Sequence, residues 1–460
     1  MNRMEQLSSF RKDADNAFKD VKNFISTMID ELSFVETDAF LSGKSFLDEK
    51  SVICEGILTG YATVDCMPVY IVAQNSALMG GSLGKAGAEK ICKCIDKALR
   101  AGAPLISIID SNGARLGEGV SAMEAYASII SAVSQVAGRI PHICIIKGNA
   151  IGMQSAYCAL ADFVIAMPES VYSVGAPMMI ASKANHTTKV QEILGAKKLL
   201  DNGNVHFAPK DINECALIVK KLLSFVPSEN GSAIIATEDD FNRQIAISRE
   251  SSPSEILSSL CDDGDYIIVG KEEGDIVCGL GRIGEKVVGA LFTKGKLTKK
   301  GIQTATRFIN YLDSFGITLM TFVNSSIIES DINEELNGQT YALSDLFYAI
   351  TTSDSAKIAV ILGDAIGVSY AAFASKSAGF DYVFALPDSV VAPITPELAV
   401  DVFYSDEIKN ATDPVSAREK IENKYAELSD VFVSAREGYI DNVVEPAMLR
   451  PYVIGVIQML

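Results

Sequence analysis

Apolar runs and amphipathic segments alternate along two separate stretches of the chain. Short runs dense in Val, Ile and Leu predict buried strands, and apolar positions that recur every three or four residues predict helices. In the first stretch the pattern predicts helices over 85–100, 121–137 and 152–161, strands over 104–109, 142–146 and 163–166, a loop over 110–119 and a turn over 147–151. In the second it predicts helices over 299–314, 340–352 and 367–378, strands over 318–323, 357–362 and 381–385, a loop over 324–338 and a turn over 363–366.

Strands that alternate with helices in this way indicate βα units. Such units build a mostly parallel sheet that is buried on both faces by its helices. The predicted fold class is therefore α/β.

The second stretch repeats the first. The phrase GNAIG at 148–152 returns as GDAIG at 363–367, 215 positions later. The last matched points, Asp162 and Asp381, lie 219 positions apart, four more than the offset of 215. The second copy has therefore gained four residues in its helix region. The chain therefore contains two copies of one α/β module.

A polar stretch separates the two copies. The segments PSENGS (227–232) and SRESSPSE (248–255) carry turn formers and charges without a sustained period, which is typical of a linker. We therefore predict two domains, 1–235 and 236–460, that arose by internal duplication.

The repeated turn carries candidate chemistry. A strand that turns at glycines into a helix leaves the first helical amides without intrahelical partners. With the helix dipole, these amides can donate to a ligand oxygen that becomes negative during a reaction. The alternative is that the glycines only let a helix pack closely on the sheet. A matched pair of turns favours the first interpretation, because two turns suit two reacting carbonyl groups.

Charge excludes several kinds of partner. The chain has 40 Lys and Arg against 58 Asp and Glu, a formal net charge of −18. Binding to nucleic acid or an anionic membrane requires a surplus of basic residues, so neither is expected. An anionic ligand would have to be held by backbone donors or a few basic side chains.

The expected compartment is the cytoplasm. The N-terminal residues carry mixed charge and no apolar core segment, which is unlike a secretory signal. No apolar run approaches the ~18 to 20 residues of a membrane span. Nine cysteines, an odd number in mostly apolar contexts, indicate reduced thiols rather than a disulfide framework or a metal site. His142, His186 and His206 are isolated, and no nucleophile–base constellation is apparent.

Several motifs resemble the carboxyltransferase subunits of biotin-dependent acyl-CoA carboxylases and decarboxylases, the propionyl-CoA carboxylase beta-like family. Residues 56–120 contain TGY, GGSLG, GAP and SNGAR followed by EG. The resemblance continues through RIPHICIIKGNAIG and ALADFVIAMPES, and through GIQTATRFINYLDSFGITLMTFV and AREGYIDNVVEPAMLRPYV in the second half. It covers most of the chain in order.

This resemblance implies a fold of two tandem crotonase-like (ClpP/crotonase) domains. It implies that a carboxyl group moves between biotin and the carbon alpha to the thioester of a short-chain acyl-CoA. One oxyanion hole would stabilise the thioester enolate and the other the ureido oxygen of biotin. The N-terminal domain would hold the acyl-CoA and the C-terminal domain the biotin, with sites completed in a homo-oligomer, either a dimer or a trimer of dimers.

The resemblance also implies site residues and partners. The implied catalytic amides are those of Gly152, Met153, Gly367, Val368 and Ser369. The candidate contacts with coenzyme A or biotin are Gly113, Arg115, Lys147, Gly148 and Ile366. Because the chain has no biotin attachment motif and no evident ATP-binding segment, biotin would be carried by a separate biotin carrier protein. A biotin carboxylase or decarboxylase partner subunit would complete the complex.

Some positions depart from the family pattern and leave alternatives open. The family usually has paired glycines where this chain has Gly152-Met153 and Gly367-Val368, and the loop 324–338 differs from the usual sequence. These departures would suit a non-catalytic partner subunit. A crotonase-type hydratase or isomerase with Glu169 as general base is a third, less favoured hypothesis. Arg115 could pair with Glu118 or contact a coenzyme A phosphate.

Overall fold

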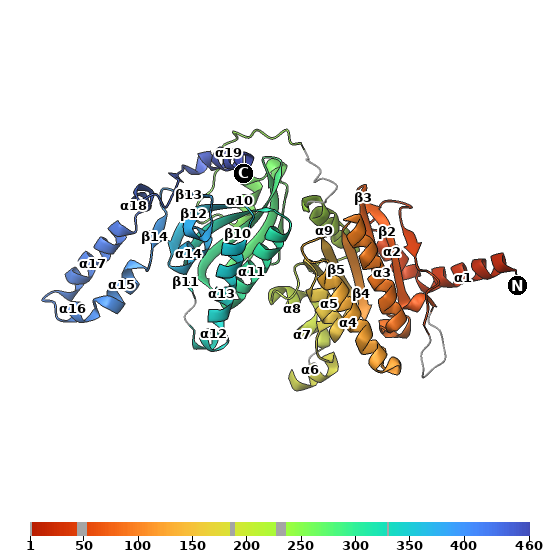
Figure 1. Cartoon of the computed structure of the whole chain (residues 1–460). Helices are drawn as coiled ribbons and strands as arrows, with labels where there is room; N and C mark the ends of the chain where they lie inside the picture. Colours follow the sequence, from red (N-terminus) through yellow and green to blue (C-terminus); the bar gives the residue numbers. More distant parts are fainter. Residues whose placement is uncertain (1, 44–52, 185–188, 227–235, 329–330) are drawn as a thin grey trace. The chain divides into compact units, whose positions relative to one another are not determined.

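The computed structural model describes residues 2–43, 53–184, 189–226, 236–328 and 331–460. Its contacts divide the chain into two compact units, Met1–Ala233 and Ile234–Leu460 (Figure 1). The expected domain boundary at residue 235 lies outside the described residues.

The first unit is built on one mixed sheet in the order β1-β2-β3-β4-β5-β6, with β7 beside β5. The strands are β1 (Val35–Thr37), β2 (Ile57–Val64), β3 (Met67–Gln74), β4 (Leu105–Ser111), β5 (His142–Ile151), β6 (Phe163–Ala166) and β7 (Val171–Ser173). Strands β1 to β3 pair antiparallel, and pairing from β3 to β6 and between β5 and β7 is parallel. The parallel part matches the predicted βα units, and the antiparallel edge was not predicted.

The first unit also contains helices. They are α1 (Arg3–Ala17), α2 (Lys19–Ser26), α3 (Lys85–Ala101), α4 (Val120–Ser134), α5 (Met153–Ala159), α6 (Pro177–Ala184), α7 (Val190–Leu194), α8 (Ala196–Asp201) and α9 (Ile212–Phe225). Figure 1 shows α3, α4 and α5 along the sheet, and α1 projecting from it toward the N-terminus. The apolar residues of α3 recur at helical spacing, so Ile91, Ile95 and Ala98 enter the core with Leu105 of β4.

The second unit repeats this plan in the order β15-β13-β12-β11-β10-β9-β8, with β14 beside β12. Its strands are β8 (Tyr266–Val269), β9 (Ile276–Ile283), β10 (Lys286–Leu297), β11 (Thr318–Ile328), β12 (Lys357–Ile366), β13 (Tyr382–Ala385), β14 (Val390–Ala392) and β15 (Asn442–Val443). Its helices are α10 (Pro253–Leu260), α11 (Lys299–Ser314), α12 (Ile332–Leu336), α13 (Gln339–Thr352), α14 (Val368–Phe373), α15 (Pro396–Phe403), α16 (Ser405–Lys409), α17 (Pro414–Leu428), α18 (Val431–Arg436) and α19 (Leu449–Met459).

Matching hydrogen bonds confirm the internal duplication. The His142 N–H donates to the Asp162 carboxylate at 2.8 Å, and the Asp162 N–H donates to the His142 carbonyl at 3.0 Å. Lys357 and Asp381 form the same reciprocal pair at 2.8 and 2.9 Å. The carboxylates therefore occupy one structural position, as expected from the four-residue gain.

The predicted turns at 147–151 and 363–366 are wrong. Residues 147–151 continue β5, and 149–151 pair with β7. Residues 363–366 continue β12, and 364–366 pair with β14. The change of direction is confined to the next residue, Gly152 or Gly367. The turns were predicted because a strand rich in glycine and polar residues lacks the apolar pattern, although its backbone groups still pair with a neighbour.

Two other predicted segments differ in the second unit. The expected loop at 324–338 contains the end of β11 and the helix α12, with residues 329–330 outside the described part. The expected helix at 367–378 is divided into α14 and a 3-10 helix, Lys376–Ala378.

All nine cysteines are free, and seven of them are buried: Cys54, Cys94, Cys144, Cys158, Cys215, Cys261 and Cys278. None of the described helices is long and apolar enough to cross a bilayer. Within the same residues, His, Cys, Asp and Glu form no cluster able to hold a metal ion.

Candidate functional site

Gly152 turns the chain from β5 into α5. Its φ of 66° and ψ of −134° lie in a region that favours glycine. A Cβ there would meet nothing within 4 Å, so the backbone conformation, not space, requires the glycine. The Gly152 N–H donates to the Ser173 carbonyl of β7 at 3.0 Å. The sheet therefore uses the amide that was expected to face a ligand.

The amides that follow Gly152 have no such partner. Helix α5 begins at Met153 without a capping side chain. The Ser155 N–H donates to the Gly152 carbonyl at 3.0 Å, whereas the N–H groups of Met153 and Gln154 have no acceptor among the described residues. Gln154 is fully buried, so the Met153 amide is the accessible donor at the first turn. Met153 itself is 42% exposed.

The second turn has the same geometry. Gly367 has φ of 58° and ψ of −119°, and its N–H donates to the Ala392 carbonyl of β14 at 2.9 Å. In the described part of the chain, the N–H groups of Val368 and Ser369 have no acceptor. Both units thus present free amides at the same point of the same module.

The sequence contains a signal for β7 and β14, two strands that were not predicted. The segment MPESVYS (167–173) returns as LPDSVVA (386–392), 219 positions later, and its last three residues form β7 and β14. These strands accept the hydrogen bonds of the Gly152 and Gly367 N–H groups. Had this second repeat been used, the expected donors would have begun one residue later, at Met153 and Val368.

Buried polar side chains support each turn and were not predicted. Under the second turn, the Ser325 hydroxyl lies 2.7 Å from the hydroxyls of both Thr293 and Ser369. At the equivalent place in the first unit, the Gln74 amide donates to the Gln154 side-chain carbonyl at 3.3 Å. These contacts tie the first turn of each helix to the sheet.

Arg115 lies in a buried ion-pair network. Its guanidinium donates to Glu55 at 2.6 Å, to Glu118 at 3.1 Å and to the Ser82 carbonyl at 3.0 Å, and the residue is only 3% exposed. The pairing with Glu118 is therefore realised, and a contact with a phosphate stays a prediction. Nearby Gly113, with φ of 105°, accepts a hydrogen bond from the Leu83 N–H at 2.9 Å.

The other predicted ligand contacts occupy different environments. Lys147 is partly exposed, with its Nζ 3.7 Å from the Asp110 carboxylate. Gly148 packs directly against that carboxylate. Ile366 is buried at 3% exposure and pairs with Ala392. A contact of Ile366 with a ligand would therefore involve its backbone.

The described histidines do not lie at the turns. His142 is buried in the first unit, with Nε2 2.9 Å from the Ser107 hydroxyl, and burial lowers its pKa to about 3. His206 accepts a hydrogen bond from the Val164 N–H through Nδ1. His186 lies outside the described residues. Glu169 is exposed and has no hydrogen-bond partner in the described chain.

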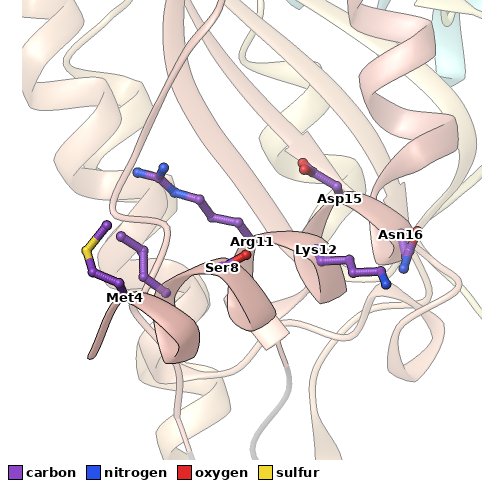
Figure 2. Close-up of a pocket in the computed structure, with 7 residues that line it drawn as sticks. Met4, Ser8, Arg11, Lys12, Asp15 and Asn16 are labelled. Atoms are coloured by element: carbon purple, nitrogen blue, oxygen red, sulfur yellow. The ribbon is translucent and has the colours of Figure 1, made fainter. Parts of the chain in front are cut away.

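Two cavities lie along the N-terminal helix. One of about 380 Å³ follows α1 and is lined by Met4, Leu7, Ser8, Arg11, Lys12, Asp15 and Asn16 (Figure 2). Another, of about 500 Å³, lies between α1, α2 and β1. Neither contains a residue of either turn.

Comparisons with known proteins identify the family of this chain. The carboxyl transferase domain family matches residues 21–460, so α1 lies before the match. The chain is 29% identical to the methylmalonyl-CoA carboxyltransferase 12S subunit of Propionibacterium freudenreichii subsp. shermanii, over 95% of this chain and 87% of that one. It is 30% identical to the methylmalonyl-CoA decarboxylase subunit alpha of Veillonella parvula, over 95% and 89%.

A solved structure has the same fold. The transcarboxylase 12S crystal structure, a hexamer with methylmalonyl-coenzyme A bound, superposes with a TM-score of 0.90. It is 27% identical and covers 99% of this chain and 94% of its own. The expected two-domain α/β fold is confirmed. The chain therefore belongs to the carboxyl transferase domain family, and it is a carboxyltransferase subunit of the kind found in biotin-dependent acyl-CoA enzymes.

Proposed function

We propose that this chain moves a carboxyl group between carrier-bound biotin and the alpha carbon of a short-chain acyl-CoA. The observation that carries the proposal is the matched pair of turns at Gly152 and Gly367, each followed by free amides. A reaction with two carbonyl oxygens that gain negative charge requires two such sets of donors.

The first turn would act on the acyl-CoA. The N–H group of Met153, a residue that is 42% exposed at the start of α5, would donate to the thioester oxygen as it becomes an enolate oxygen. Gln154 behind it is fully buried. Preorganised donors of this kind stabilise developing charge without reorganisation. The chain thereby lowers the cost of removing a proton from the alpha carbon.

The second turn would act on biotin. When bound, biotin supplies or accepts the carboxyl group. The N–H group of half-buried Val368 is suited to its ureido oxygen, a neutral acceptor that gains negative charge when its carboxyl group leaves. Ser369, the next residue, is fully buried. The buried hydroxyls of Ser325 and Thr293 would hold Ser369 in place during this step.

The proposal includes an assembly. The first unit would be the acyl-CoA side and the second the biotin side, in a cytoplasmic homo-oligomer that works with a biotin carrier protein and a biotin carboxylase or decarboxylase subunit. The transcarboxylase 12S relative is described as a hexamer, which supports an oligomer of this chain.

The test is a carboxyl-exchange assay in both directions. The purified chain is incubated with carboxylated biotin and acetyl-, propionyl- or butyryl-CoA, and with biotin and methylmalonyl-CoA. We expect exchange with at least one short-chain pair. A chain that binds acyl-CoA but exchanges no carboxyl group with any of them would contradict the proposal and favour the non-catalytic partner subunit.

A further inference from the structure

Each turn rests on one polar side chain from the neighbouring strand. Asp110 of β4 accepts a hydrogen bond from the Asn149 N–H at 3.2 Å through Oδ1. Asn324 of β11 accepts one from the Asp364 N–H, also at 3.2 Å and through Oδ1. Asn149 and Asp364 each lie three residues before the glycine that starts the turn. An equivalent side chain therefore holds the last strand residues in both units.

The space that the Asp110 or Asn324 side chain occupies explains why Gly148 and Gly363 begin the two repeated phrases. A Cβ on Gly148 would lie 2.1 Å from Asp110 Oδ1, and one on Gly363 would lie 2.3 Å from Asn324 Oδ1. Neither glycine has a positive φ, so alanine could adopt the backbone conformation at both positions. Only the neighbouring Asp110 or Asn324 side chain excludes it.

Each turn is flanked by one carboxylate and one cation, but the carboxylate stands at different positions in the two units. Asp110 is buried at 6% exposure, accepts a hydrogen bond from the Ser76 hydroxyl at 2.6 Å and lies 3.7 Å from Lys147. In the second unit the supporting residue is the neutral Asn324, and the carboxylate is instead Asp364, 3.5 Å from Arg249. One carboxylate and one cation thus flank each turn, and the shared feature of the support is a side-chain oxygen acceptor, not a charge.

We propose that Asp110 and Asn324 are positioning residues that fix the strand ends before Gly152 and Gly367, and through them the free amides that follow. The inference rests on the proposed function for its catalytic consequence. Its structural part, the coupling between Asp110 and Gly148, stands independently of the substrate.

The test uses four variants of the full chain: D110N, D110A, G148A and D110A/G148A. Two quantities are measured, hydrogen exchange of the peptides that span residues 148–157 and the kcat and KM of carboxyl exchange. Thermal melting confirms that each variant is folded. D110N keeps an oxygen acceptor, as Asn324 does in the second unit, so its exchange protection and kcat should stay within about threefold of the parent.

D110A removes the acceptor, and we expect faster hydrogen exchange at 148–157 and a kcat lowered at least about tenfold, with KM within about threefold. G148A should have a similar effect because its Cβ displaces the carboxylate. The double variant D110A/G148A should be no worse than D110A, since the added Cβ then enters vacated space.

Multiplicative losses in the double variant, unchanged hydrogen exchange in D110A, or a D110N variant as impaired as D110A would each overturn the inference. Hydrogen exchange needs no substrate, so it decides the inference even if the parent chain exchanges no carboxyl group. An active parent whose D110A variant keeps full protection and kcat would instead refute the positioning role and leave the proposed function intact.

Discussion

At the scale of single residues, the chemistry proposed for this chain depends on backbone groups. The N–H groups of Gly152 and Gly367 donate to carbonyls of the neighbouring strands, so the amides left without an acceptor are those of the residues that follow. The proposed donors are therefore the amides of Met153 and Val368, whose side chains stand where glycines are usual in the family. An amide donates regardless of the side chain it carries, so this departure does not remove the donor.

Proline at residue 153 tests the donor directly. Met153 is the first residue of α5, a position that tolerates proline, and the ψ of −134° at Gly152 is compatible with a following proline. M153P should lower kcat by about 10²–10³-fold, the usual effect of losing one oxyanion donor. M153A keeps the N–H and should retain kcat within a few-fold. Equal activity of the two variants in the carboxyl-exchange assay would exclude this amide as a donor.

The buried imidazole of His142 makes the stability of the protein sensitive to acid. Burial lowers its pKa from 6.5 to about 3. Between these values the unfolded chain binds a proton at this imidazole and the folded chain does not, so stability falls as the pH falls below about 6.5. Burial raises the pKa of nearby Asp162, which has the opposite effect. A comparison of variants is therefore needed to isolate the histidine.

The variant H142Q can keep a hydrogen bond to Ser107 without titrating. When the pH is lowered from 7.5 to 5.5, the parent should lose about 1.4 kcal/mol of unfolding free energy more than H142Q. Urea unfolding of both chains at each pH measures this difference. Parallel pH profiles would show that His142 titrates normally in the folded protein.

At the scale of elements, the loop between β4 and α4 is held by its ion pairs. Arg115 joins Glu55, which precedes β2, to Glu118 in the same loop, and Glu118 also accepts the Lys85 N–H at the start of α3 at 2.8 Å. These contacts connect three segments that are distant in sequence. They favour a structural role for Arg115 over a contact with a phosphate.

The variant R115M separates these two roles. Removing the guanidinium leaves the Glu55 carboxylate buried without its partner, which should cost about 3 kcal/mol or more of unfolding free energy. R100M is the matched control, because Arg100 pairs with Asp96 on the exposed surface of α3 and should contribute little. A normal unfolding midpoint for R115M, with a raised KM for acyl-CoA, would instead assign Arg115 to phosphate binding.

At the scale of the whole molecule, duplication has placed one turn in each unit. The two units keep the same sheet plan and the same reciprocal hydrogen bonds at Asp162 and Asp381. Other side chains have diverged, as at the equivalent positions Gln154 and Ser369. The proposed reaction needs both turns. An oligomer could draw the two turns of one site from different chains.

Mixing two impaired variants tests that arrangement. M153P disables the first turn and V368P the second, and each alone should have a kcat lowered by about 10²–10³-fold. Co-expressed, they should regain exchange activity above that of either, because some sites would combine an intact first turn from one chain with an intact second turn from another. A mixture no more active than its components, with mixed oligomers present by mass spectrometry, would place both turns of a site in one chain.

The sequence by itself determined the α/β class, the duplication and the two positions where chemistry was expected. Apolar periodicity and a repeat at constant spacing follow directly from residue order, so helix 299–314 and strand 163–166 were predicted with the bounds that the structure has. Only the tertiary structure decided which amides are free and why the first glycines recur. Those answers depend on pairing with β7 and β14 and on the approach of Asp110 and Asn324, which are contacts between segments that the local pattern does not connect.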